Sequence, residues 1–300
     1  MAAGLALEQP LEEAIIGSSL WRDAGRRLRR NPAAMLGLAL IGLFVIVAVA
    51  APVIAPYDPT VGSFRRADHF LLPNAQHLLG TDIQGRDVLS RIMWGARSSL
   101  WVAVLSVAIG LSIGLVYGAI SGYAGGWVDF WMMRVVDIIL SLPGLLLTIT
   151  IVLFLGPGLN TIALAIAVEN VPVFARILRS SILALKGSDF ALATRSIGAT
   201  GTRILVRHIL PNALTPVIVA STLALATAIV DAAGLGFLGF GPQDPATPEW
   251  GTMLTDTYRY LQSGAAFTAL FPGVAIVISV LGFNLLGDGL REALDPRLKR

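Results

Sequence analysis

The sequence predicts an all-α integral membrane protein with six transmembrane helices and a further helical segment between the fourth and the fifth. Of its 300 residues, 55% are hydrophobic and only 14% are charged, which is too apolar for an ordinary soluble domain. Five stretches contain no charged residue, and each exceeds the roughly 20 residues that cross the hydrocarbon as a helix. These stretches are 31–57, 98–128, 138–168, 209–230 and 260–287.

Six spans follow from these five stretches because one of them is interrupted. The sequence GPGLN at 156–160 breaks the third stretch into two helices. The first span exceeds the apolar region of a signal peptide, so we interpret it as a retained anchor. The fourth carries Glu169, Asn170 and Pro172, and a soluble amphipathic helix competes with a span there. The predicted spans are about 35–54, 98–121, 136–155, 160–182, 212–232 and 265–287, in one domain, 34–300, after an N-terminal segment, 1–33.

The basic residues predict the orientation, because cytoplasmic connections accumulate Lys and Arg. With the N-terminus inside, the inner connections hold sixteen of the 22 basic residues and the outer connections hold six. We therefore expect a multi-pass protein of the plasma (inner) membrane with both termini and the segment 1–33 in the cytoplasm. The basic residues lie between apolar runs and form no single stripe, so membrane lipid is an expected partner and nucleic acid is not.

A basic, helix-forming segment, SDFALATRSIGATGTRILVRHILPN at 188–212, falls on the cytoplasmic side between the fourth and fifth spans. Apolar residues recur at helical spacing on both sides of Gly198 and Gly201, where a sharp turn is allowed. Pro211 suits the first turn of the following span. We expect a compact helix pair in the cytosol. It either docks a partner protein or lies on anionic lipid, and spacing alone leaves both interpretations open.

The sequence contains no pattern for catalysis of its own. A phosphate-binding loop needs a glycine-rich turn that leads into Lys, and neither Lys186 nor Lys299 follows a glycine. There is no HExxH and no G-x-S-x-G motif, and the three histidines lack metal-ligand spacing. We therefore expect no enzymatic activity, no cofactor and no metal site in this chain. The energy for any transport must come from a partner or from an ion gradient.

Three carboxylates lie in or beside the predicted spans: Asp137, Glu169 and Asp231. Asp137 and Asp231 fall near the membrane interfaces, where snorkelling or capping explains them. Glu169 is a candidate for a translocation path, where it would meet an ammonium group of the transported solute. Pairing with Arg176, or a place near the outer interface, is the competing interpretation.

Glycines at 110, 114, 118 and 122 form a stripe of small residues on the second span, which we interpret as a packing face between helices. The same face is also a candidate contact with a partner subunit. Pro143 is expected to bend or loosen the third span. On the outer side, 80–100 suggests an interfacial helix that enters span two, and 234–250 suggests an ordered loop. Each of these two segments is expected either to receive a partner protein or to cover the translocation path.

Several motifs resemble one family. The segment 188–212 is similar to the cytoplasmic loop of ABC-importer permeases, "EAA, three residues, G, nine residues, I-x-L-P", at Ala193, Gly198, Leu210 and Pro211. Leu192 stands where the family has Glu. The stretches LLGTDIQGRDVLSRIMWGARSSL, GLGFLGFGPQDPATPEWGTML and FPGVAIVISVLGFNLLGDGLREALDPRL look like the C-type permease of dipeptide, oligopeptide and nickel importers. The resemblance runs from about residue 30 to the C-terminus.

The resemblance implies the type I permease fold of ABC importers, in which the cytoplasmic loop forms a coupling helix on an ATPase subunit. By position, the helix would run from Asp189 to Gly198. The implied partners are a second permease, two cytoplasmic ATPase subunits that bind ATP and Mg²⁺, and an extracytoplasmic substrate-binding protein. The residues implied for ATPase coupling are Asp189, Phe190, Ala193, Thr194, Arg195, Ile197, Gly198, Arg203, Arg207, His208 and Pro211.

The expected function is therefore that of a pore subunit in an ATP-driven importer. Di- and oligopeptides are the cargo by resemblance, and nickel chelates are the alternative within the family. A gradient-driven secondary transporter that works alone and a membrane scaffold that transports nothing are the competing classes. Co-purification of ATPase subunits and ATP-dependent uptake would separate the three.

Overall fold

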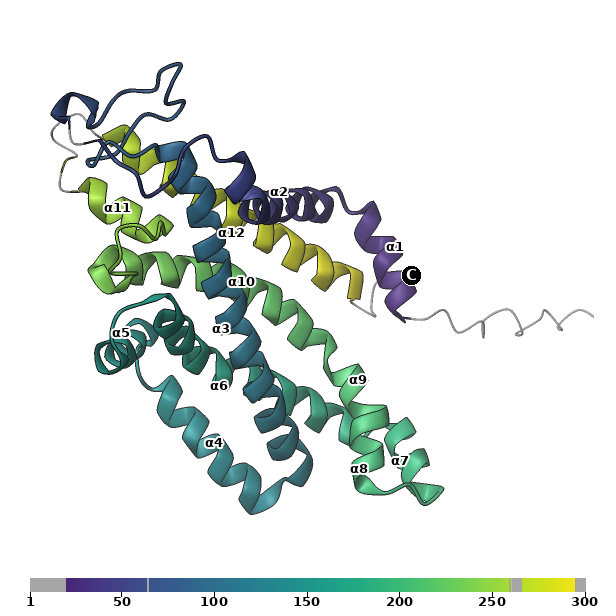
Figure 1. The fold of residues 1–300 in the computed structure, drawn as a ribbon. Helices are drawn as coiled ribbons and strands as arrows, with labels where there is room; N and C mark the ends of the chain where they lie inside the picture. The colour runs from purple at the N-terminus through teal and green to yellow at the C-terminus, as the bar shows by residue number, and fades with distance from the viewer. Residues whose placement is uncertain (1–19, 64, 259, 261–265, 295–300) are drawn as a thin grey trace, which may run out of the picture.

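The computed structural model describes residues 20–63, 65–258, 260 and 266–294, and its regular structure in this part of the chain is helical (Figure 1). One isolated antiparallel bridge joins Thr81 to Asp87. The predicted all-α fold class is confirmed. The elements are α1 (Leu20–Arg30), α2 (Pro32–Ile54), the short η2 (Arg66–Asp68), α3 (Val88–Ala124), α4 (Gly126–Leu140), α5 (Gly144–Leu155), α6 (Leu159–Lys186), α7 (Asp189–Ser196), α8 (Gly201–Ile204), the π-helical turn η3 (Leu205–Ile209), α9 (Leu210–Ala213), α10 (Thr215–Leu235), the π-helical turn η4 (Gly236–Phe240), α11 (Trp250–Tyr258) and α12 (Ala266–Leu294).

Five of the described helices are long and apolar enough to cross a membrane: α2, α3, α6, α12, and α10 together with η4. Their large apolar side chains are often exposed, as on α2, which suits contact with lipid tails. The pair α4 and α5 passes the same test and gives a sixth span if the two helices cross together.

The predicted span 136–155 is bent at Pro143, as expected, and α4 and α5 meet there at an angle of 88°. The break falls at Pro143, which lacks a backbone N–H and restricts the residue before it. Pro143 has an extended ψ of 126°, and α5 begins at the next residue, Gly144. The expected loosening at this proline therefore becomes a full change of direction.

The glycine stripe on α3 packs against α6. A Cβ atom at Gly110, Gly114 or Gly118 would lie 2.5–2.8 Å from an atom of α6, and one at Gly122 would lie 3.1 Å from the Ile182 side chain. The interpretation as a packing face is confirmed. A helix of the same chain occupies this face, so it is not the contact with a partner permease.

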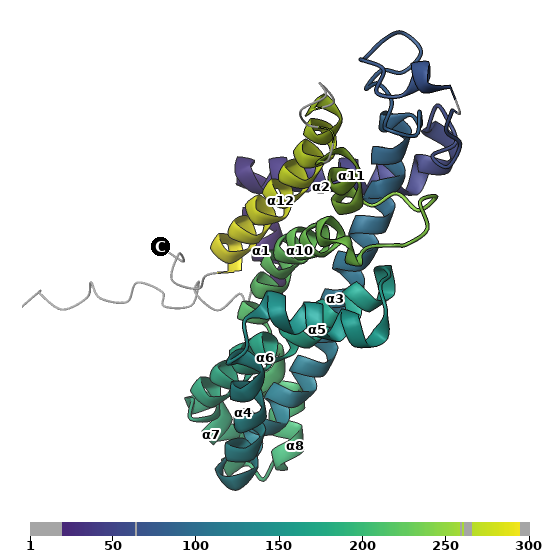
Figure 2. The same ribbon diagram turned by 90° about the vertical axis from the view of Figure 1, so that its left-hand side faces the viewer.

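Helices α2 and α12 form a second close pair, in which a Cβ at Gly37 would lie 2.6 Å from the Gly282 carbonyl oxygen. Helix α10 packs against both α12 and α3. The two views show the 55–87 segment and α11 toward one end of α3 and the α7–α8 segment toward the other (Figures 1 and 2). Helix α1 lies beside the end of α12. Residues 1–19 of the predicted N-terminal segment lie outside the described residues.

Candidate functional site

The predicted helix pair is present between α6 and α10, and we call residues 188–213 the inner projection, after the orientation that the basic residues predict. The Ser188 carbonyl oxygen accepts from the backbone N–H of Ala191 and of Leu192, both at 3.0 Å, and this starts α7. The helix ends where Gly198 adopts a φ of 82°, a left-handed conformation that favours glycine. A second short helix, α8, then begins at Gly201.

Most side chains of the inner projection face solvent. Ile197 is 85% exposed, and Leu192 and Phe190 are 49% and 40% exposed. Thr194 and His208 are half-buried. The structure therefore brings the predicted coupling residues together on one protruding segment with exposed apolar and basic groups. The other predicted coupling residues, all exposed, are Asp189, Ala193, Arg195, Gly198, Arg203, Arg207 and Pro211.

Two residues connect the inner projection to the spans, and the sequence analysis did not select either as a site residue. Lys186, at the end of α6, donates from Nζ to the Tyr123 carbonyl oxygen at 2.6 Å, and its ammonium lies 5.1 Å from the Tyr123 ring centroid. A Cβ at Gly201 would lie 2.8 Å from the Tyr123 hydroxyl oxygen. Tyr123, in the last turn of α3, thus lies against the end of α6 at Lys186 and against the start of α8 at Gly201. The sequence offered one signal for Lys186, which is one of only two lysines in the chain.

The prediction that Pro211 opens the following span is wrong. Pro211 lies in the first turn of α9, and α10 begins at Thr215 with Pro216 in its own first turn. Leu214 between them is close to helical, and its N–H donates to the Leu210 carbonyl. Because neither Pro211 nor Pro216 has an N–H to donate, the helical hydrogen-bond ladder is interrupted at both prolines, and α10 begins at the second interruption.

Glu169 is half-buried on α6 and faces the bend between α4 and α5. A Cβ at Gly144, the first residue of α5, would lie 1.9 Å from Glu169 Oε1, so only glycine leaves room for this carboxyl group. Asp231 of α10 is near enough to act on Glu169 electrostatically. In the described part of the chain, the side chains of Glu169 and Asp231 make no hydrogen bond and no ion pair.

The alternative pairing of Glu169 with Arg176 is wrong. Arg176 Nη2 contacts Asp137 Oδ1 at 2.8 Å, and both side chains are about half exposed. Arg179, one turn further, forms a two-pronged contact with Asp129, at 2.5 Å from Nε to Oδ1 and from Nη2 to Oδ2. These pairs hold α4 against α6 and leave the Glu169 carboxyl group facing α5.

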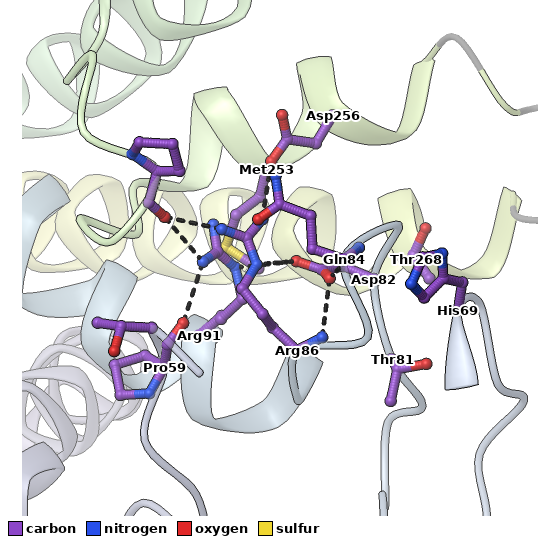
Figure 3. A network of polar contacts seen from close by, with 12 residues as sticks. Pro59, His69, Thr81, Asp82, Gln84, Arg86, Arg91, Met253, Asp256 and Thr268 are labelled. Atoms are coloured by element: carbon purple, nitrogen blue, oxygen red, sulfur yellow. Dashed lines mark hydrogen bonds and ion pairs between the residues drawn. The ribbon is translucent and has the colours of Figure 1, made fainter. Parts of the chain in front are cut away.

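A second polar site lies at the other end of α3, and we call Asp82, Arg86, Arg91, Pro245 and Asp256 the outer cluster (Figure 3). Arg86 is 1% exposed and Arg91 is 2% exposed. Arg86 Nε contacts Asp82 Oδ2 at 2.6 Å, its Nη1 donates to the Pro245 carbonyl oxygen at 2.8 Å, and its Nη2 contacts Asp256 Oδ2 at 3.3 Å.

Arg91 completes the outer cluster from the first turn of α3. Its Nη1 donates to the carbonyl oxygens of Pro59, at 3.2 Å, and Pro245, at 3.3 Å, while its Nε lies 3.4 Å from Asp82 Oδ2. Burial raises the pKa of Asp256, and the charges of Arg86 and Arg91 oppose that rise. The outer cluster thus binds the 55–87 segment, the loop before α11 and α11 itself to the start of α3.

The prediction of an interfacial helix over 80–100 is wrong for the first eight of these residues, 80–87, because α3 begins at Val88. Gly85 has a φ of 69°, and Asp82 Oδ1 accepts from the backbone N–H of Gln84 and Arg86, which makes a turn. Asp87 then caps α3 by accepting from Ser90 N at 2.8 Å. Asp82, Arg86, Asp87 and Arg91 are buried in the protein and do not lie at a lipid interface, whereas Arg97 is exposed.

Glu249 is a further buried carboxyl group that the sequence analysis did not single out. It is 1% exposed, and its two oxygens accept from the backbone N–H of Gly251, at 2.8 Å, and of Thr252, at 2.9 Å. Burial raises the pKa of Glu249 to about 7, although these hydrogen bonds act in the opposite direction. Glu249 caps α11. A Cβ at Gly236 would lie 2.2 Å from Glu249 Oε2, so the Glu249 carboxyl group also packs against the chain at the end of α10.

Trp250, which follows Glu249, anchors α11 on α3. The indole is fully buried, and Nε1 donates to the Ile92 carbonyl oxygen at 3.1 Å. A Cβ at Gly95 would lie 2.8 Å from the indole ring, so Gly95 provides the space for it. The stretch 234–250 is therefore a loop only over 241–249, because 234–240 is helical in α10 and η4. Helix α3 holds this loop through Arg91 at Pro245 and through the buried Trp250.

Comparisons with known proteins identify relatives along the whole chain. The family model for the binding-protein-dependent transport system inner membrane component matches residues 114–300. The model for the N-terminal TM domain of oligopeptide transport permease C matches residues 19–74. The dipeptide transport system permease protein DppC of Alkalihalophilus pseudofirmus is 45% identical over 292 residues, which cover 97% of this chain and 94% of that protein.

Further relatives agree with these matches. The DppC protein of Escherichia coli is 50% identical over 279 residues, 91% of each chain. The glutathione transport system permease protein GsiD of Shigella flexneri is 46% identical over 279 residues, 93% of this chain and 91% of that protein. A chain from the inward-facing MetNI methionine ABC transporter superposes with a TM-score of 0.56 at 23% identity, covering 68% of this chain and 96% of that chain, which is a likeness of fold.

Proposed function

This chain belongs to the family of inner membrane components of binding-protein-dependent transport systems, and from that membership we propose that it is the pore-forming permease of an ATP-driven dipeptide and oligopeptide importer. The observation that carries the proposal is the inner projection, which presents exposed apolar side chains on a short helix outside the spans. The named functions of the relatives support the peptide cargo.

The inner projection is the site where a cytoplasmic ATPase subunit docks in this proposal. Phe190, Leu192 and Ile197 supply the apolar contacts, and apolar groups that stay exposed outside the spans favour a protein partner. Leu192 replaces the Glu of the family motif, so apolar contact and shape take the place of a carboxylate. ATP and Mg²⁺ bind to the partner, and Tyr123 and Lys186 transmit movement of α7 to α3 and α6.

The proposed orientation places both termini and the inner projection in the cytoplasm of a multi-pass inner-membrane protein. The excess of basic residues in the inner connections supports it. The outer cluster then faces the extracytoplasmic side, where a substrate-binding protein delivers the peptide. A second permease of the same family completes the pore, and closure of the ATPase pair shifts it between outward and inward states.

Glu169 is the proposed contact of the translocation path with the ammonium group of a peptide. It lies half-buried at the bend between α4 and α5, without an ion pair in the described part of the chain. Replacing Glu169 with Gln keeps the shape and removes the charge, so uptake of a peptide with a free N-terminus should fall. Unchanged uptake by the variant would remove Glu169 from the path.

Cysteine crosslinking tests the docking proposal directly, because the chain contains no cysteine. Single cysteines replace Ile197 and Leu192 on the inner projection, and one replaces Val61, which is 65% exposed in the outer segment, as the matched control. We expect the first two variants to capture the ATPase subunit in membranes of cells that express the whole transporter, and the Val61 variant to capture none.

Reconstitution in liposomes separates the competing functions. The complete transporter should take up dipeptide only with ATP. Uptake by the permease alone under an ion gradient would favour a secondary transporter, and an absence of uptake under both conditions would favour a scaffold. Persistent uptake without any ATPase contact at 189–205 contradicts the proposal.

A further inference from the structure

A cavity of about 560 Å³ lies between α1, the start of α2 and the end of α12. Its lining includes Arg27 and Arg30 from α1, Asn31 between α1 and α2, and Gly289 and Glu292 from α12. Figure 1 shows these three elements side by side. Gly289 makes this approach possible, since a Cβ there would lie 2.3 Å from Ala34 Cβ and 3.5 Å from Leu28 Cδ1.

The cavity carries an excess of positive charge. Neither Arg27 nor Arg30 forms a hydrogen bond or an ion pair with its side chain in the described part of the chain. The one carboxylate in the lining, Glu292, accepts from Asn31 Nδ2 at 2.7 Å. Asn31 Oδ1 in turn caps α2 by accepting from Ala34 N at 3.1 Å. Two guanidinium groups thus face one carboxylate that already has a partner, beside the positive end of α2.

The spacing along α1 separates these arginines from others on the same helix. At about 100° per residue, Arg27 and Arg30 fall within roughly 60° of each other, whereas Arg29 points away from Arg27 by about 160°. Arg29 is exposed and does not line the cavity. It therefore provides a control with the same charge on the same helix.

We infer that this cavity binds the phosphate of an anionic phospholipid of the phosphatidylglycerol class. Guanidinium groups bind phosphate with two parallel hydrogen bonds, and basic cavities at the cytoplasmic ends of spans suit anionic headgroups. The cavity adjoins the beginning of α2, where Met35 and Leu36 are exposed apolar side chains at the edge of the span. A ligand with a phosphate and acyl chains matches both surfaces, whereas a soluble anion matches only the first.

The bound lipid holds α1 on the membrane surface and fixes the entry of α2 beside α12. This role depends on the position of α2 in the bilayer and not on the peptide cargo. A failure of the lipid-binding inference is therefore distinguishable from a failure of the proposed transport function.

Native mass spectrometry of the whole transporter tests the inference. The complex is purified, stripped of lipid and reloaded with phosphatidylglycerol or with phosphatidylcholine of the same acyl chains. We expect wild type to retain phosphatidylglycerol preferentially, and the double variant Arg27→Gln/Arg30→Gln to lose about tenfold or more of that retention, since two charged hydrogen-bonding groups are removed. Arg29→Gln should retain the lipid as wild type does.

Three results would overturn the inference. The first is equal retention of the two lipids by wild type. The second is an equal loss in Arg29→Gln and in the double variant, because attraction would then be spread over all basic residues of α1. The third is displacement of the lipid by millimolar inorganic phosphate, which would indicate a site for a soluble anion. If the double variant does not assemble, the single variant Arg30→Gln replaces it, because Arg30 is exposed, and a severalfold loss is expected.

Discussion

The outer cluster and the inner projection lie at opposite ends of α3 and are stabilised in opposite ways. The outer cluster buries two guanidinium groups and satisfies them with carboxylates and backbone carbonyls from distant segments. The inner projection leaves its most exposed large apolar residue, Ile197, 85% exposed and has few buried side chains, among them Ala191, Ile204 and Ile209.

The difference indicates which end of the molecule is complete within one chain. A buried charge is costly unless it is paired and hydrogen-bonded, so the outer cluster persists only in one arrangement of the segments that supply its partners. Exposed apolar side chains outside the membrane gain stability only when another surface covers them. The outer cluster is therefore fixed by contacts within this chain, whereas the exposed apolar side chains of the inner projection have no cover among the described residues.

Replacing Arg86 with Ala should produce the largest loss of stability. The change leaves Asp82, which is 8% exposed, without its 2.6 Å partner and removes the shorter of the two hydrogen bonds to the Pro245 carbonyl oxygen. Breaking a buried ion pair in this way costs about 3–5 kcal/mol. The measurement is the apparent Tm of the purified transporter. The control Arg97→Ala removes an exposed arginine of α3 whose contact is with the Trp94 ring, and should cost about 1 kcal/mol or less. Equal shifts in the two variants would contradict the role of burial.

Glu249 should make the stability of the outer end depend on pH. Its pKa in the folded protein is about 7, raised from an ordinary value of 4.5, so the folded state binds the proton more tightly than the unfolded state. This contribution is fully present below the unfolded pKa and is lost as the pH rises toward about 7 and beyond. The shift corresponds to at most about 3 kcal/mol.

The apparent Tm of the transporter should therefore fall between roughly pH 5 and pH 8. The variant Glu249→Gln keeps an oxygen that can cap α11 and cannot titrate, so its Tm should change less over the same range. Asp256, whose pKa is also raised by burial, contributes in the same direction and remains in both proteins. Parallel pH profiles for wild type and the variant would show that Glu249 titrates normally.

The sequence predicted the features that depend on local pattern. Apolar runs located the spans, and Gly198 located the turn of the inner projection, because each signal lies within a few residues. The contacts of Arg86 could not be predicted, since Pro245 and Asp256 are 159 and 170 positions away along the chain. The alternative that paired Arg176 with Glu169 was wrong for the same reason, because the actual partner, Asp137, lies 39 positions earlier on another helix. Pro143 predicted a bend, but the angle between α4 and α5 depends on how both pack against α6.

Replacing Ile197 with Ala should have the smallest effect on stability and should therefore test the comparison most sharply. Because the side chain is 85% exposed, its loss should change the free energy of unfolding by about 0.5 kcal/mol or less. An apolar anchor at a protein interface contributes more, about 1–2 kcal/mol, so association with the ATPase and ATP-dependent uptake should fall by roughly tenfold.

The matched control for Ile197 is Val61→Ala, which shortens an exposed apolar side chain at the outer end and should change neither Tm nor association with the ATPase. If Ile197→Ala instead lowered the Tm as far as Arg86→Ala does, the inner projection would be held by contacts within its own chain. The two ends of α3 would then differ in chemistry but not in their dependence on a partner. A loss of association at constant Tm, in contrast, places the missing contacts of the inner projection on another subunit.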